Sequence, residues 1–197
     1  MSRSDQATRR GRRQLLLVGS LFIVPVVTAV VLYRSVDWRP VVNARGTLIE
    51  PPRPLAIAGG SLPDGGPAPA DVFQRRWSVI RPVAGACGER ERALLDELAR
   101  VRLALDKDAG RVRRVVVHDG GCAADELGDG GADLLILAAR GPEGAGFLAQ
   151  FPPAVDGAPG IYIADPHGNL MMSYPAAGSA RGLLKDLERL LRLSSIG

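Results

Sequence analysis

Aromatic side chains are scarce in this sequence, at 5% of its 197 residues, and most of it carries no excess of positive charge. The net charge of +4 is reached before residue 15, where five arginines stand against Asp5: Arg3, Arg9, Arg10, Arg12 and Arg13. The rest of the chain has 20 basic and 20 acidic residues. A neutral chain with few rings offers neither the phosphate-binding track nor the stacking platform that nucleic acid requires. We therefore exclude that class of function.

Cysteine is also scarce, with only Cys87 and Cys122 in the chain. Neither belongs to a CxxC or CxxxC motif, because Arg90 and Glu91 stand three and four residues after Cys87. A dithiol centre within one helical turn is therefore absent.

Long hydrophobic runs are limited to residues 15–33, LLLVGSLFIVPVVTAVVLY. As a helix rising ~1.5 Å per residue, this run spans about 28 Å, close to the ~30 Å hydrocarbon core of a membrane, and Pro25 should kink it. The arginines before the run outnumber Arg34 and Arg39 after it. The positive-inside rule then predicts a cytoplasmic tail at residues 1–14, a single pass through the inner membrane, and a periplasmic remainder.

A cleaved signal peptide is the alternative for this run, and Arg12 and Arg13 would suit the twin-arginine type. The run is longer than a usual signal sequence, and no clear small-residue cleavage site follows it, so we favour a retained anchor. In both cases the rest of the chain reaches an oxidising compartment, where two cysteines can pair.

Residues 34–72 are rich in proline and glycine, which predicts a linker or arm without a long regular element. Within it, the segment GTLIEPPRPL at residues 46–55 is apolar and extended by its prolines. We interpret this segment as a spacer packed on its own domain. A segment that docks on a partner is the alternative.

Residues 73–197 are predicted to form an α/β domain. The patterns indicate, in chain order, a strand at 77–83, a helix at 89–107, a strand at 112–117, a loop at 119–133, a strand or helix at 134–139, a hairpin at 161–164 and 170–174, and a helix at 181–193. The first three form a βαβ unit with parallel strands and a right-handed crossover. This order resembles the thioredoxin fold.

The segment GAPGIYI at residues 157–163 carries the same resemblance. In thioredoxins a similar segment leads into the third core strand through a cis-proline bond. The resemblance implies that the Ala158–Pro159 bond is cis and that Pro159 has a structural role, since X-Pro bonds are those at which the cis form is accessible.

The thioredoxin resemblance also assigns a place to Cys87. In thioredoxin-like proteins the reactive cysteine lies at the N-terminus of the first helix, where the helix dipole stabilises a thiolate. Peroxiredoxins carry Thr or Ser three residues before their cysteine, and this chain has Ala84 there. Peroxidase activity is therefore not expected.

The predicted anchor, residues 46–55 and the segment IYIADPHG at residues 161–168 together resemble Sco-type copper chaperones and associated proteins of cytochrome c oxidase assembly. Sco-type proteins bind copper through CxxxC and a histidine in a Val-Asp-His segment. Only Cys87 matches, because Glu91 replaces the second cysteine and Gly157 the histidine. The resemblance implies the context of oxidase assembly, whereas these replacements argue against copper as a cofactor.

Cys122 and His118 are the remaining candidate site residues. Neighbouring parallel strands end at the same edge of a sheet, so Cys122 could form a disulfide with Cys87 if their Cα atoms lie within about 7 Å. The two could also share a metal, with His118 as a third ligand. We favour two unrelated thiols and a capping histidine, and we expect His167 to be solvated in a turn.

The predicted anchor and domain, together with the Sco-type resemblance on which the link to the oxidase rests, imply a membrane-tethered accessory factor for a respiratory cytochrome c oxidase. It would act as a non-catalytic thioredoxin-like module that binds oxidase subunits or assembly factors. One alternative is a thiol–disulfide or copper-transfer protein that uses Cys87 with Cys122. A second alternative is a structural subunit of a membrane complex.

Overall fold

The computed structural model describes residues 17–28, 30–31, 45–57, 59–122, 124–127, 131–153 and 159–196. The chain divides into two compact units, residues 1–43 and 44–197. In the first unit the described residues are helical and carry exposed apolar side chains, and they lie inside the predicted membrane span. Among all described residues, no helix combines the length and the apolar character needed to cross a membrane.

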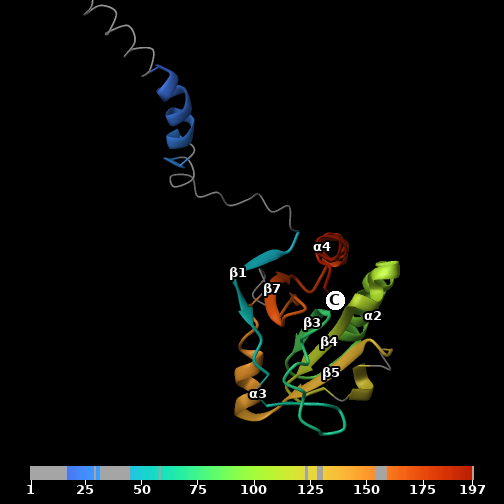
Figure 1. Ribbon diagram of the computed structural model, residues 1–197. Helices are drawn as coiled ribbons and strands as arrows, with labels where there is room; N and C mark the ends of the chain where they lie inside the picture. The colour runs from blue at the N-terminus through green and yellow to red at the C-terminus, as the bar shows by residue number, and fades with distance from the viewer. Residues whose placement is uncertain are drawn as a thin grey trace, which may run out of the picture. The chain divides into compact units, whose positions relative to one another are not determined.

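The second unit is built around a seven-stranded sheet in the order β1-β7-β6-β3-β4-β5-β2 (Figure 1). The strands are β1 (Thr47–Pro54), β2 (Gly60–Ser61), β3 (Trp77–Val83), β4 (Val112–His118), β5 (Leu134–Ala139), β6 (Ile161–Ala164) and β7 (Asn169–Tyr174). β3, β4 and β5 are parallel, and the other neighbouring pairs are antiparallel. The predicted βαβ unit and the predicted hairpin are both present.

Three α-helices cover the sheet: α2 (Glu89–Leu103), α3 (Gly141–Leu148) and α4 (Ala180–Leu193). The leucines of α2 and α4 share one core cluster with side chains of β3, β4, β6 and β7. On the opposite face, α3 contributes Phe147, which packs with Phe151 and Phe73. Figure 1 shows α3 separated by the sheet from the other two helices. The domain is therefore a three-layer α/β structure.

The centre of the sheet is formed by β3 and β4, which are buried along almost their whole length, as is typical of parallel strands covered on both faces. Every residue of β3 is buried, including Arg81. The two strands pair from Trp77 opposite Val112 to Val83 opposite His118. Because they end side by side, the loops that follow them leave from the same edge of the sheet.

The expectation that residues 34–72 contain no long regular element was wrong. β1 is an eight-residue strand at one edge of the sheet, and β2 pairs with β5 at the other edge. An edge strand needs ladder hydrogen bonds on one side only, so it tolerates prolines, and the pairing shifts register between Leu48 and Arg53. The Glu50–Pro51 bond is cis. The compact unit thus begins at residue 44, not at the predicted boundary of 73.

Helix α3 was not predicted, because Gly141, Pro142, Gly144 and Gly146 give its sequence a low helix propensity. Its packing on β5 depends on one of these glycines. A Cβ atom at Gly144 would lie 2.1 Å from the carbonyl carbon of Ala139. Glycine at this position therefore allows the helix backbone to approach the strand backbone.

The structure differs from the prediction, or makes it more definite, in three other elements. Helix α2 ends at Leu103 and is followed by a 3-10 helix, η1 (Asp106–Arg111), instead of continuing to residue 107. The ambiguous run at residues 134–139 is strand β5. A second 3-10 helix, η2 (Ala124–Leu127), lies within the predicted loop.

We expect Gly144→Ala to lower the free energy of unfolding by about 1–3 kcal/mol, because the added methyl group must displace α3 from β5. Gly146→Ala is the matched control, since Gly146 is an exposed residue of the same helix and an added Cβ would have no neighbour within 4 Å. This control should raise stability by about 0.5–1 kcal/mol. Urea denaturation measures both, and equal effects of the two substitutions would contradict the close packing.

Candidate functional site

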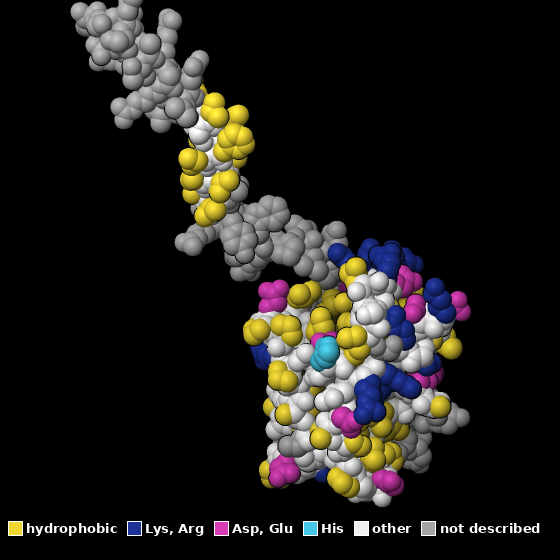
Figure 2. Space-filling view, in the orientation of Figure 1, with side chains coloured by type: hydrophobic (Ala, Val, Ile, Leu, Met, Phe, Trp, Pro, Cys, Tyr) yellow, Lys and Arg dark blue, Asp and Glu magenta, His cyan; other side chains and the backbone are white. Residues whose placement is uncertain are grey.

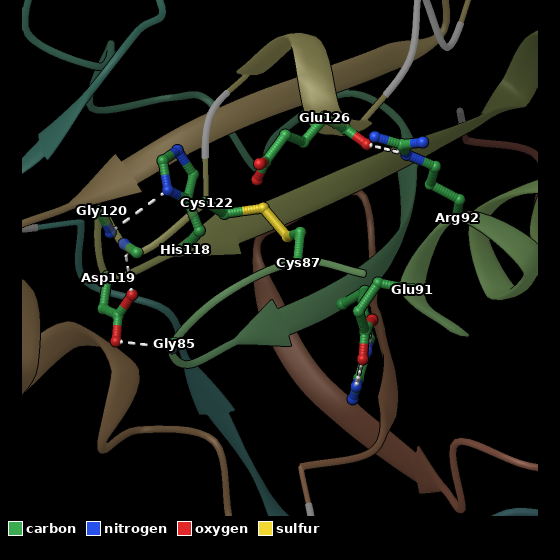
Figure 3. The surroundings of a disulfide bond; sticks show 11 residues. Gly85, Cys87, Glu91, Arg92, His118, Asp119, Gly120, Cys122 and Glu126 are labelled. Carbon is green, nitrogen blue, oxygen red and sulfur yellow. Dashed lines mark hydrogen bonds and ion pairs between the residues drawn. A yellow bond between two sulfur atoms is a disulfide. The ribbon is translucent and has the colours of Figure 1, made fainter. Parts of the chain in front are cut away.

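Cys87 and Cys122 form a disulfide, with their Cα atoms 5.1 Å apart (Figure 3). Cys87 lies four residues beyond Val83, and Cys122 lies four residues beyond His118, the strand partner of Val83. Two loops of equal length thus leave neighbouring points of the sheet edge and meet at the sulfur atoms. Our interpretation of two unrelated thiols was wrong, because adjacent parallel strands deliver both loops to one edge.

Asp119 holds the two cysteine loops together independently of the sulfur atoms. Its carboxylate accepts hydrogen bonds from the backbone N–H of Gly121 (2.8 Å) and of Gly85 (2.9 Å), and these bonds lower the pKa of Asp119. The loops also touch directly, because a Cβ at Gly121 would lie 2.7 Å from the carbonyl carbon of Gly85. The cysteines are therefore held near each other by backbone geometry as well as by their bond.

The two sulfur atoms differ in their surroundings. Cys122 is 2% exposed, whereas Cys87 is partly exposed and precedes Gly88, the N-cap residue of α2. After reduction, Cys87 would be the accessible thiol, and the helix dipole would stabilise its thiolate. The bond joins residues 35 positions apart, a loop for which the chain-entropy model gives about 3–4 kcal/mol of stabilisation. The disulfide can thus serve the fold, redox chemistry, or both.

Glu91, which stands at the second-cysteine position of a CxxxC motif, forms an ion pair with Arg81 of β3. The Nε and Nη2 atoms of Arg81 donate to the two carboxylate oxygens of Glu91 at 3.0 and 2.6 Å. The Arg81 side chain is only 8% exposed. In Figure 3 the Glu91 side chain points away from the disulfide. Both carboxylate oxygens of Glu91 are therefore engaged by Arg81 in an interaction that stabilises the fold.

The same guanidinium also reaches the segment before β6. Nη1 of Arg81 donates to the carbonyl oxygens of Pro159 and Gly160, the latter at 3.2 Å. One buried cation thus connects β3, the first turn of α2 and the entrance to β6. Burial makes these partners necessary, because an unpaired charge inside the protein is strongly destabilising.

His118 is 4% exposed, and its Nδ1 accepts a hydrogen bond from the N–H of Gly120 at 3.2 Å. Burial and the positive charge of Arg140 lower the pKa of His118, although Asp119 opposes them, so the imidazole is neutral at pH 7. Within the described parts of the chain, no three His, Cys, Asp or Glu side chains form a group that could hold a metal. His118 is therefore placed near the disulfide without completing a metal centre.

Other predicted site residues have different outcomes. His167 is exposed in the turn between β6 and β7, and its backbone N–H donates to Asp165. Gly157, at the position of the Sco-type histidine, lies outside the described residues. The Ala158–Pro159 bond also cannot be described, because Ala158 lies outside them, and its cis form stays a prediction.

Sequence analysis missed two residues that organise the site, Arg81 and Asp119. Arg81 carries a recognisable signal, because a charge between Ile80 and Pro82 in an otherwise apolar strand requires a buried partner. Asp119 carries no such signal. Its partners are backbone N–H groups in loops whose conformation the sequence does not reveal.

An apolar cleft of about 230 Å³ lies beside the start of the Cys87 loop. Its lining comes from the end of β3, from α3 and the residues after it, and from the entrance to β6: Pro82, Val83, Ala84, Leu148, Phe151, Pro153, Pro159 and Tyr162. The cleft gives the site an apolar surface next to a polar, disulfide-closed edge.

We expect Glu91→Gln to lower the free energy of unfolding by about 3 kcal/mol, because it leaves the buried Arg81 without its counter-charge. Glu89→Gln is the matched control, since Glu89 is exposed in the same helical turn. It loses only its interaction with the helix dipole, about 0.3–1 kcal/mol. Chemical denaturation under non-reducing conditions measures both losses. If the two substitutions cost the same, the Arg81–Glu91 pair does not have the role assigned to it.

Comparison with solved structures shows the same fold in Sco proteins. Copper-bound Sco1 of yeast matches with a TM-score of 0.57 and 15% identity, over 76% of this chain and 93% of that one. Apo Sco1 of Thermus thermophilus matches with a TM-score of 0.56 and 19% identity, over 74% and 95%. BsSco, described as a member of the Sco family of cytochrome c oxidase assembly proteins with a disulfide switch, gives 0.54 and 9%, over 73% and 96%.

Comparison with curated proteins finds no match. A family model described as "Transmembrane-like, thioredoxin-like, C-terminal domain" matches residues 77–194, from β3 to the end of α4. The matched region includes both cysteines, Arg81 and Glu91, and it confirms the predicted thioredoxin-like domain. The chain therefore belongs to this family of transmembrane-like proteins with a thioredoxin-like C-terminal domain.

Proposed function

We propose that this protein is a membrane-tethered accessory factor in the assembly of a respiratory cytochrome c oxidase, and that its thioredoxin-like domain acts by binding a partner. The observation that carries this proposal is a Sco-like fold in which only Cys87 matches a Sco-type copper ligand, whereas Glu91 and Gly157 stand at the other two ligand positions. The likeness extends over at least 93% of the three Sco structures named above. BsSco is described as belonging to a family of oxidase assembly proteins.

The residues at the site favour partner binding over copper transfer. Copper(I) prefers soft thiolate and imidazole ligands. Here the second-cysteine position holds Glu91, whose two oxygens are occupied by Arg81, and Cys87 is consumed in the disulfide. His118 uses Nδ1 to accept the Gly120 hydrogen bond. This donor set does not fit the copper site of a Sco-type protein.

The membrane tether is supported by the apolar run at residues 15–33 and by the arginines that precede it. The side chains of its described part are exposed and apolar, including Leu17, Leu21 and Phe22 at 70% each. A hydrocarbon environment is the one in which such a surface is stable. The arginine asymmetry supports a domain in the periplasm, the compartment in which a Cys87–Cys122 disulfide persists.

The apolar cleft next to the Cys87 loop supports the role of a binding module. It is lined by side chains without charge, among them Phe151, Pro153 and Tyr162. Burial of apolar surface is the main source of affinity between proteins. An oxidase subunit or another assembly factor that offers an apolar segment is the partner class that this surface suits.

A second candidate function is thiol–disulfide exchange, and the Cys87–Cys122 bond itself favours it. The partly exposed sulfur of Cys87 lies at a helix N-terminus, where nucleophilic thiolates are stabilised, and Cys122 is a buried resolving partner. An incoming dithiol would attack Cys87, release the Cys122 thiolate and leave oxidised as the protein is reduced. Thiol–disulfide exchange requires both cysteines, whereas a binding module does not require their redox chemistry.

Complementation of a gene deletion in the native host tests the proposal. Deletion should lower the amount of assembled oxidase, measured from reduced-minus-oxidised haem spectra of membranes, and the full-length chain should restore it. A Cys87→Ser/Cys122→Ser variant, checked for equal abundance, should restore it as well. Unchanged oxidase after deletion would contradict the proposal. Failure of the cysteine variant alone would favour thiol–disulfide exchange.

A further inference from the structure

Helix α4 carries a row of basic side chains on its exposed side. Arg181, Lys185, Arg189 and Arg192 are all exposed, and their spacing of four, four and three residues places them on one side of the helix. Glu188 is the exposed acidic residue on that side. Among the described residues, none of the four basic side chains forms a salt bridge. Figure 2 shows Lys and Arg side chains gathered at the end of the domain where α4 lies.

The start of the domain lies against the same helix. The buried carboxylate of Asp186 accepts hydrogen bonds from the backbone N–H of Arg45 (2.8 Å) and of Gly46 (3.0 Å). It also accepts the hydroxyl of Tyr174 at 2.8 Å, and burial together with Asp186 raises the pKa of that hydroxyl, so it remains a donor. The chain that leads to the predicted anchor therefore leaves the domain at α4.

Arg45 extends the basic row. Its side chain runs beside Gly182, where an added Cβ would lie 3.1 Å from the Cβ of Arg45. Arg45 is exposed, and it lies beside Gly182, the residue that follows Arg181 in α4. We call Arg45, Arg181, Lys185, Arg189 and Arg192 the α4 basic row.

The length of the chain limits how far this row can lie from a membrane. Twelve peptide units separate residue 33, the end of the predicted span, from Arg45. Even a fully extended chain of this length covers at most about 43 Å. If residues 15–33 span the membrane, this length sets an upper limit on the distance of Arg45 from the end of the span.

We propose that the α4 basic row binds anionic phospholipid headgroups of the membrane that the anchor crosses. This inference rests on the membrane tether of the proposed function. Basic side chains near an anionic surface each contribute to binding, so the five of this row outweigh the repulsion from the single Glu188. Two apolar side chains at the end of the helix can enter the interface, since Leu193 is 75% and Ile196 is 49% exposed.

The two lysines of the chain provide a direct test. Lys185 belongs to the α4 basic row, and Lys107 is exposed in η1 and serves as an internal control. The full-length protein is reconstituted into vesicles of phosphatidylcholine, with or without phosphatidylglycerol, and treated with a membrane-impermeant amine-acylating reagent. Mass spectrometry then gives the ratio of modification at Lys185 to that at Lys107.

Phosphatidylglycerol should lower this ratio at least about fivefold, because the bound headgroups cover Lys185. High salt should reverse the effect, since ~1 M salt screens charges beyond about 3 Å. Neutralising the three arginines that α4 contributes to the row should also reverse it, in the variant Arg181→Gln/Arg189→Gln/Arg192→Gln. A matched variant on exposed arginines elsewhere should retain the protection: Arg53→Gln/Arg75→Gln/Arg76→Gln.

An unchanged ratio in vesicles that retain the protein through an alkaline carbonate wash would overturn the lipid-binding role while leaving the tether intact. It would make an acidic protein surface the remaining occupant of the row. Loss of the protein in that wash would instead contradict the tether on which both proposals rest. Protection that persists in the triple α4 variant would also overturn the assignment to this row.

Discussion

A buried guanidinium must be neutralised and hydrogen-bonded, and Arg81 meets both demands with groups from two other parts of the chain. It lies in the central strand β3, binds the carboxylate of Glu91 in α2, and donates to the carbonyl groups of Pro159 and Gly160 before β6. Most of the site follows from this arrangement. The first turn of α2 is held on the sheet, and Glu91 is withdrawn from any ligand.

The two cysteines of the site follow two neighbouring strands, β3 and β4, instead of lying within one helical turn. β3 and β4 end side by side, Asp119 joins their loops through backbone hydrogen bonds, and Gly85 and Gly121 allow these loops to touch. Cys87 then pairs with Cys122 in place of a cysteine on its own helix. The domain thus shares the fold of the Sco structures, and its two cysteines are joined by a long-range disulfide while Glu91 is held in an ion pair with Arg81.

Much of the fold could be predicted because the buried strands form short apolar segments and the apolar residues of α4 recur with helical periodicity. β1 was missed because its prolines argue against a strand in the interior of a sheet. Prolines are tolerated in an edge strand, but the position of a strand in the sheet is known only from the assembled fold. α3 was missed because its glycines lower the helix propensity of the segment. The reason for Gly144 is its close packing on Ala139 of β5, which local propensity does not reveal. For the site, strand order placed Cys87 and Cys122 at one edge. Their bonding could not be predicted, since it depends on the close approach of two glycine-containing loops.

We propose that this site does not coordinate copper, because Glu91 is held by the ion pair with Arg81 and Cys87 by the disulfide. The most direct test is a Cu(I) competition titration of the full-length protein in detergent, with its disulfide intact and a strong chelator as competitor. We expect binding no tighter than about micromolar, because Cys87 is bonded to Cys122 and Glu91 is paired with Arg81, which leaves the site without a thiolate ligand. Stoichiometric Cu(I) retained against the chelator, and lost on Cys87→Ser, would contradict this proposal.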